Sequence, residues 1–158
     1  MGGHRAARRT LLFELTSSAP HVAPQFAHYA AADALGVSAK AQRDIGRQVA
    51  DRLRESYAGA IIRSLRLVGA LTPHAVLSRF PSAWERLVQG GGARVFEVGP
   101  KEIRVECLRT DIAQFRYVRE GWAGMFEGTL ALVSRSLHVT ELPGHRGPDR
   151  CAYLIAWV

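Results

Sequence analysis

Apolar positions recur at helical spacing through the first half of the chain, from residue 25 to about residue 71. In its later part, large apolar side chains repeat every four residues: Ile45, Val49, Leu53 and Tyr57. This spacing predicts an amphipathic helix with a wide apolar face. Gly36 can end one helix and Ser38 can begin another, so we expect a break between residues 35 and 38.

Proline and glycine divide the next segment into short helices. Thr72 has the side chain of an N-cap, and Pro73 suits the first helical position. Pro81 then predicts an interruption, after which Ser82 is expected to cap a short helix through Trp84. Three consecutive glycines at residues 90–92 end this part of the chain.

The hydrophobic period changes to two after these glycines. Residues 93–99 and 102–108 both alternate, and a Gly-Pro-Lys turn separates them, which predicts a hairpin. In its second strand Ile103, Val105 and Cys107 should share one face. Residues 135–142 and 150–158 predict two more strands. The last one is apolar on both faces, so we expect it in the middle of the sheet or covered on both sides.

A helix with three glycines is predicted between the two strand pairs, from Asp111 to about Ser134. Each glycine costs a helix interior about 1 kcal/mol relative to alanine. Gly121, Gly124 and Gly128 share one side, where a bare backbone lets another layer approach closely. That layer is the sheet, the long first helix or the same helix of a second subunit. The alternatives are a ligand or partner on this side, or a helix break near Gly121.

The order of elements predicts an α+β fold. We expect N-terminal helices packed on a four-stranded antiparallel sheet, in the order ααα-ββ-α-ββ. Residues 1–24 are interpreted as a basic tail and short lead-in, and residues 25–158 as a single α+β domain.

Composition restricts the setting in which the domain works. The 158 residues are 47% hydrophobic and 22% charged, which is typical of a folded protein. The net charge is +7, but Arg43 and Arg47 alternate with Asp44 and Asp51, as on a solvated helix face. Nucleic-acid binding is therefore not expected. No apolar run reaches the roughly 18 residues of a membrane span, and we expect a cytoplasmic protein with reduced cysteines.

The sequence carries no recognisable catalytic motif. It lacks a nucleophile elbow, a phosphate-binding loop and a histidine pair at metal-ligand spacing, so we predict a protein that is not an enzyme and has no cofactor. Cys107, His138, His145 and Cys151 lie on or beside neighbouring predicted strands, which would allow a zinc cluster. Buried thiols and a loop histidine are the preferred interpretation, and no metal site is predicted.

Aromatic and cationic residues near the glycine-bearing helix suggest a pocket. Its candidate residues are Trp84, Arg116, Tyr117, Arg119 and Trp122. Aromatic walls with one or two cationic groups suit an amphipathic or anionic ligand. The preferred interpretation is nevertheless that the tryptophans are core residues and the arginines face solvent.

The second half of the chain resembles a group of related domains. The resemblance lies in the order strand, strand, "FRYVREGWAGMFEGTLALV", strand, "GPDRCAYLIAWV", in the Pro-x-x-Trp of "LSRFPSAWERL", and in the final Tyr153-x-x-x-Trp157. It covers about residues 71–158 and is similar to the bacterial 4-vinyl-reductase domain, the haem-nitric-oxide-binding domain and the TRAPP small subunits. The most similar pattern is a myxobacterial paralogous family of unknown function allied to them.

This resemblance implies helices on a four-stranded antiparallel sheet, often paired into dimers. The related domains bind small hydrophobic molecules, haem or protein partners. Their ligand motifs are incomplete here: no Tyr-x-Ser-x-Arg occurs, and Pro143 replaces the first cysteine of a Cys-x3-Gly-x3-Cys pattern whose second half matches Gly147 and Cys151.

Two functional hypotheses follow. The first is a non-enzymatic sensory or adaptor domain in signalling, which acts through protein-protein contacts with an unidentified partner and as a homodimer. The second is a small hydrophobic-molecule-binding domain with its pocket under the glycine-bearing helix.

Overall fold

The computed structural model describes residues 23–53, 57–67, 69, 71–88 and 90–158. The chain divides into two compact units, Met1–Ser38 and Ala39–Val158. The first unit contributes helix α2 (Ala23–Ala34), which is followed by Gly36 at φ +67°, so the predicted helix break is confirmed. The basic tail predicted at residues 1–24 lies almost wholly outside the described residues.

The second unit begins with four helices, so the described part of the chain has five helices before its first strand, where the ααα order predicted three. They are α3 (Ala39–Leu53), α4 (Tyr57–Leu67), α5 (Pro73–Leu77) and α6 (Phe80–Leu87). Thr72 caps α5 as predicted, accepting a hydrogen bond from the Ala75 amide at 3.1 Å. The expectation that Ser82 caps the next helix is wrong. Pro81 lies in the first turn of α6, where its missing amide hydrogen costs nothing.

Four antiparallel strands follow in the predicted ββ-α-ββ order. They are β1 (Gly92–Gly99), β2 (Glu102–Leu108), β3 (Leu137–Glu141) and β4 (Arg150–Trp157), arranged in space as β1-β2-β4-β3. The α+β fold class is therefore confirmed. So is the inner position of β4, which pairs with β2 on one side and β3 on the other.

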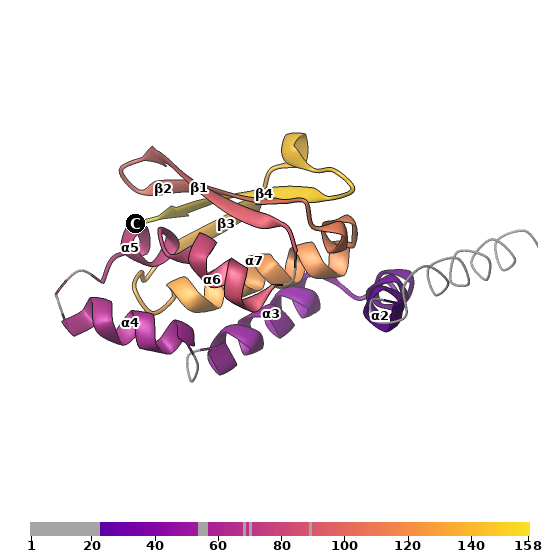
Figure 1. Ribbon diagram of the computed structural model, residues 1–158, viewed down its shortest axis with the longest axis horizontal. Helices are drawn as coiled ribbons and strands as arrows, with labels where there is room; N and C mark the ends of the chain where they lie inside the picture. Colours follow the sequence, from indigo (N-terminus) through magenta and orange to yellow (C-terminus); the bar gives the residue numbers. More distant parts are fainter. Residues whose placement is uncertain (1–22, 54–56, 68, 70, 89) are drawn as a thin grey trace, which may run out of the picture. The chain divides into compact units, whose positions relative to one another are not determined.

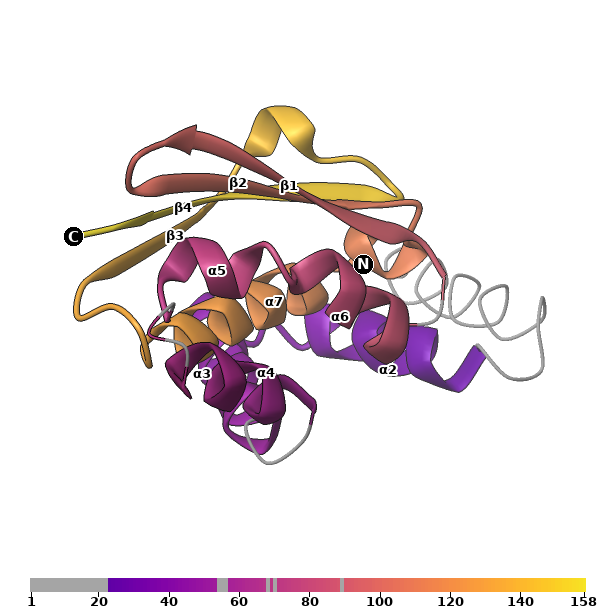
Figure 2. The ribbon, with the colours of Figure 1, turned by 60° about the vertical axis from the view of Figure 1, so that its left-hand side comes forward.

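Helices cover one face of the sheet. Figures 1 and 2 show α5, α6 and α7 (Arg116–Leu130) directly beneath the strands, with α3 beyond α7. The inward residues of β2 are Ile103, Val105 and Cys107, which are buried as their alternation predicted. Tyr153 and Ile155 of β4 lie on the same face and complete the centre of the core.

The glycine-bearing helix starts later than predicted. Asp111–Gln114 forms a short 3-10 helix, η1, and Phe115 is extended (φ −82°, ψ 127°) before α7 begins at Arg116. The chain therefore turns at Phe115, and α7 can run beneath the sheet. In the described part of the chain, no helix combines the length and apolar character that a bilayer span requires.

Candidate functional site

Helices α3 and α7 cross with their backbones in contact. A Cβ atom added to Gly124 would overlap the carbonyl oxygen of Arg43, and one added to Gly46 would overlap that of Gly121. A Cβ on Gly128 would lie 2.8 Å from the Cβ of Ala50. The pairs Gly46/Ala50 and Gly124/Gly128 thus give each helix two small residues four apart, which permits the close crossing.

The three glycines that the sequence singled out do not act alike. Gly124 and Gly128 lie at the crossing with α3. Gly121 contributes its carbonyl oxygen to the crossing, but the direction its own Cβ would take is open, with no atom within 4 Å. The small-residue side of α7 therefore faces another helix of the same chain, and the homodimer role suggested for it stays a prediction.

Ionic groups flank this crossing. Arg43 donates from Nε to Glu120 (2.7 Å) and from Nη1 to Glu127 (2.9 Å). Arg47 donates from Nη2 to the other oxygen of Glu127 at 2.6 Å. We call these four residues the α3–α7 clamp. Because both glutamates are largely buried, the clamp holds α3 in one register along α7.

The clamp changes the electrostatics of Arg43. Burial alone would lower the pKa of its guanidinium, but the hydrogen bonds and negative charges of Glu120 and Glu127 raise that pKa above the ordinary value. The sequence had suggested a solvated charged face for this part of the chain. Arg43 instead turns toward α7, because the acidic residues of α7 lie opposite it.

The apolar face of α3 is also turned differently from the expectation. Gln42, Gly46 and Ala50 are buried, whereas Ile45 and Val49 remain 40% and 43% exposed. Close helix approach requires small residues at the contact, so the large aliphatic residues are directed away from α7. The four-residue repeat predicted a helix correctly, but Ile45 and Val49 of its apolar face do not pack on α7.

The other side of α7 packs through aromatic rings. Trp84 lies edge-to-face on Trp122 (centroids 5.0 Å apart) and on Phe80 (5.8 Å). Phe80 in turn packs on Phe126 (4.9 Å), which packs on Tyr153 of the sheet (5.4 Å). These edge-to-face contacts fill the space between α6, α7 and the sheet with side chains.

The candidate pocket residues are distributed around this row of rings. Trp84 is buried and half-buried Trp122 packs against it, with the Trp84 indole nitrogen also donating to the carbonyl of Gly90 at 3.3 Å. Arg116 is exposed and Tyr117 half-buried in the first turn of α7. The structure thus brings the two tryptophans into direct contact, and their role in ligand binding stays a prediction.

Arg119 belongs to a buried polar network. Its Nη1 donates to the carbonyl oxygens of Ala113 (2.8 Å) and Gln114 (2.7 Å). Its Nε lies 3.0 Å from Glu141 as an ion pair that lacks hydrogen-bond alignment. Glu141 also accepts two hydrogen bonds from Arg146, at 2.8 and 2.9 Å. The expectation of a solvent-facing Arg119 is wrong, because a buried charge with these partners ties η1 and β3 to α7.

Tyr153 connects this network to the two cysteines. Its hydroxyl donates to the Arg119 carbonyl at 2.9 Å and accepts a hydrogen bond from the Cys151 thiol at 3.6 Å. Burial raises the pKa of Tyr153 well above its ordinary value. Cys107 and Cys151 are both free and buried, and they are direct partners in the β2–β4 pairing.

The cysteines and the two histidines near the strands do not converge. Cys107 and Cys151 face the helices, whereas His145 lies 3.8 Å from Glu106, which points to the opposite face of the sheet. His138 is exposed on β3. In the part of the chain that the structure describes, no group of three His, Cys, Asp or Glu side chains is placed to hold a metal ion.

Several of these contacts have signals in the sequence, although they were not predicted. Gly46 and Ala50 have the same spacing as Gly124 and Gly128, which is a signal for paired small-residue faces. Glu120 and Glu127 are seven residues apart and therefore lie on one face of α7. Nothing in the local sequence indicates which arginines reach them, because that contact joins segments about 80 residues apart.

The chain belongs to the family described as "Protein of unknown function (DUF2378)", which matches residues 15–158. No curated protein shows significant similarity to it.

Solved structures of H-NOX proteins have a similar fold. A mutant of the Fe(II) unliganded H-NOX protein from K. algicida is 9% identical, with a TM-score of 0.63 over 94% of this chain and 86% of its own. An oxygen-binding H-NOX domain related to soluble guanylate cyclases is 13% identical, with a TM-score of 0.54 over 89% of this chain and 73% of its own. A structure from a study of heme distortion in the H-NOX family is 14% identical, with a TM-score of 0.58 over 89% of this chain and 73% of its own.

This likeness agrees with the predicted relationship to the haem-nitric-oxide-binding domain at the level of the fold. The other resemblances, to 4-vinyl-reductase domains, TRAPP small subunits and a myxobacterial family, stay predictions.

Proposed function

We propose that this chain is a non-enzymatic sensory or adaptor domain that acts through protein-protein contacts and does not use haem. The observation that carries the proposal is the row of aromatic rings from Trp84 to Tyr153. It occupies the interior beside α7 with side chains that contact one another. Such an interior stabilises a fold and offers little room for a large planar ligand.

The histidines of the described residues support the same view. His138 and His145 are exposed strand and loop residues. His74 has Nε2 3.0 Å from the Pro100 carbonyl and Nδ1 3.6 Å from Glu97, and its ring packs edge-on against Trp157. His28 is exposed on α2. Three of these four side chains are thus exposed, and the ring of the fourth, His74, packs against Trp157, although its buried Nδ1 makes no hydrogen bond.

The outward side of α3 is the surface we assign to partner contacts. Ile45 and Val49 lie one helical turn apart and are both more than a third exposed. The α3–α7 clamp fixes the opposite side of the same helix, so the apolar pair is presented on a rigid support. A partner protein or a second copy of this chain would bury the pair, as adaptor domains require.

Haem titration tests the first part of the proposal. Purified protein is mixed with haemin, and absorbance is compared with that of free haemin and of an H-NOX protein treated alike. We expect a sharp Soret band from the H-NOX protein with haemin, and only the free-haemin spectrum from this chain. A stoichiometric Soret band from this chain would overturn the haem-free proposal.

Charge substitution on α3 tests the second part. The double variant Ile45→Asp/Val49→Asp is compared with Gln48→Asp/Arg52→Gln, which changes net charge equally at exposed positions of the same helix. We expect light scattering to show dimers for the wild type and control, and monomers for the first variant. A monomeric wild type would exclude the homodimer. Partner docking would then require that the control variant captures a partner protein in pull-downs and that Ile45→Asp/Val49→Asp does not.

A small-molecule-binding domain is the second candidate. It is favoured by the H-NOX neighbours, one of which is an oxygen-binding domain. Native mass spectrometry of the protein purified from its own cells distinguishes the two. A retained ligand whose occupancy falls on substitution of half-buried Tyr117, but not of exposed Arg79, would favour this candidate.

A further inference from the structure

The two cysteines of this chain face each other across the centre of the sheet. Cys107 is the next-to-last residue of β2 and Cys151 the second residue of β4, and the antiparallel register pairs them directly. Their exposures are 0% and 1%. Both lie on the face that packs against the helices, so their side chains start from adjacent positions and point in the same direction.

This placement satisfies the main geometric demand of a disulfide. Directly paired residues of antiparallel strands have Cα atoms roughly 4.5–5.5 Å apart. A disulfide spans Cα separations of about 4.4–6.8 Å. We propose that Cys107 and Cys151 form a reversible cross-strand disulfide when the domain meets a hydroperoxide, which would make this pair a redox-sensitive site. This inference goes beyond the proposed contact function and does not depend on it.

The surroundings give the two thiols different roles. The hydrogen bond with Cys151, together with burial, raises the pKa of Cys107 well above its ordinary value. The reciprocal hydrogen bond from Cys107 lowers the pKa of Cys151, against the opposing effect of burial. We assign Cys151, whose sulfur lies 3.6 Å from the Tyr153 hydroxyl, as the attacking thiol and Cys107 as the resolving thiol.

The reaction balances with hydrogen peroxide as the oxidant. The Cys151 thiolate attacks one peroxide oxygen, the O–O bond breaks, and the departing hydroxide takes up a proton to leave as water. Cys107 then attacks the sulfur of the sulfenic acid, so that the S–S bond forms and the S–O bond breaks. The Cys107 proton leaves with the second water. The two thiols lose two electrons, and the peroxide is reduced to two waters.

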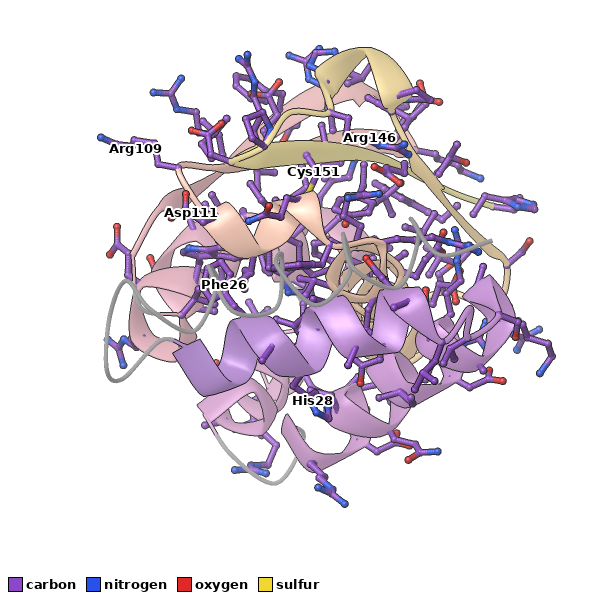
Figure 3. The ribbon with its side chains drawn as sticks, turned by 90° about the vertical axis from the view of Figure 1, so that its right-hand side faces the viewer. Phe26, His28, Arg109, Asp111, Arg146 and Cys151 are labelled. Carbon is purple, nitrogen blue, oxygen red and sulfur yellow. The ribbon has the colours of Figure 1, made fainter. Side chains whose placement is uncertain are left out.

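The proposal requires local opening of the sheet before a small oxidant can reach this buried pair. Only one further residue pair, Leu108 and Arg150, follows it before the β2–β4 ladder ends. Opening of this ladder end would expose the two core thiols, and it has to break the hydrogen bond from the Thr110 amide to the Asp149 carbonyl (2.8 Å) that lies just beyond it. Figure 3 shows Cys151 on the side of β4 that faces η1, at this end of the sheet.

Peroxide treatment followed by thiol counting tests the proposal. The folded protein is exposed to hydrogen peroxide, quenched with catalase, denatured, alkylated with iodoacetamide and weighed by mass spectrometry. We expect a monomer that has lost two hydrogens and takes up no alkyl group. Reduction with dithiothreitol before alkylation should restore two alkyl groups, and peptide mapping should identify the Cys107–Cys151 linkage.

The single variants separate the two roles. Cys107→Ala should stop at a sulfenic acid on Cys151 that dimedone traps, whereas Cys151→Ala should react with peroxide several-fold more slowly. The proposal is overturned if the wild type keeps two alkylatable thiols under peroxide that fully oxidises free glutathione. Intermolecular disulfides or sulfinic acids as main products would overturn it too. The wild-type assay distinguishes these outcomes even if a variant fails to fold.

Discussion

The two sides of α7 are packed by opposite means. On one side, Gly124 and Gly128 bring its backbone against that of α3, and the ionic clamp fixes the register. On the other side, Trp122 and Phe126 extend large rings toward α6 and the sheet. The same helix therefore packs on another helix through glycines, which lack side chains, and on the sheet through large aromatic rings. Adding a side-chain atom to the glycines should destabilise the first contact, and removing ring atoms should destabilise the second.

The largest expected change in stability comes from the aromatic side of α7. Phe126→Ala should lower the free energy of unfolding by about 3–5 kcal/mol, because it leaves a cavity between Phe80 and Tyr153. Urea titration followed by circular dichroism measures this change. Phe96→Ala is the control, since Phe96 is partly exposed and contacts Arg104 by a cation–π interaction. It should cost under about 1 kcal/mol. Equal losses would contradict the packing described for this side.

The glycine side is tested by adding single methyl groups. Gly124→Ala should destabilise by about 1–3 kcal/mol or more, because its Cβ meets the fixed backbone of Arg43. Gly121→Ala on the same helix meets open space, so the better helix propensity should stabilise by up to about 1 kcal/mol. Thermal denaturation of the two variants checks the opposite signs. Stabilisation by both alanines would mean that α3 does not lie against α7 as described.

Tyr153 lies on the sheet side of α7, where it packs on Phe126, and its effect on stability appears at high pH. Its folded-state pKa is raised by burial, so the folded state keeps a proton that the unfolded state releases above about pH 10. The stability from this group is present below that pH and is lost as pH rises, by at most about 1.4 kcal/mol per pH unit. Tyr153→Phe should change the alkaline limb of a stability–pH curve by removing this contribution to its slope. An unchanged slope between pH 9 and 11 would argue against a buried, neutral hydroxyl.

The smallest expected change in the free energy of unfolding comes from substitutions in the α3–α7 clamp. Glu127→Gln weakens the contacts to Arg43 and Arg47 and should lower the free energy of unfolding by about 1 kcal/mol, less at high salt. Asp44→Asn removes exposed contacts to Lys40 and Arg47 and should change stability little. Denaturant titrations at two salt concentrations compare the variants. If Asp44→Asn costs more than Glu127→Gln, the clamp does not determine the α3–α7 register.

The sequence alone determined the elements that depend on local rules. Alternation placed β1 and β2 within one residue of their observed bounds, and Thr72 was recognised as a cap. The apolar character of the last strand predicted its inner place in the sheet, where it pairs with β2 and β3. The glycine spacing indicated a bare helix side, although not which helix would occupy it.

Only the tertiary structure decided which residues from distant parts of the sequence are in contact. The approach of Gly46 to Gly121, the bridging of Glu120 and Glu127 by Arg43, and the burial of Arg119 all depend on segments brought together by the fold. Local periodicity reports which residues share a face, but it does not report how much of that face is covered: Ile45 and Val49 stay partly exposed, whereas Ala50 is buried. Likewise, two cysteines on separate strands become a pair only when the strand register aligns them.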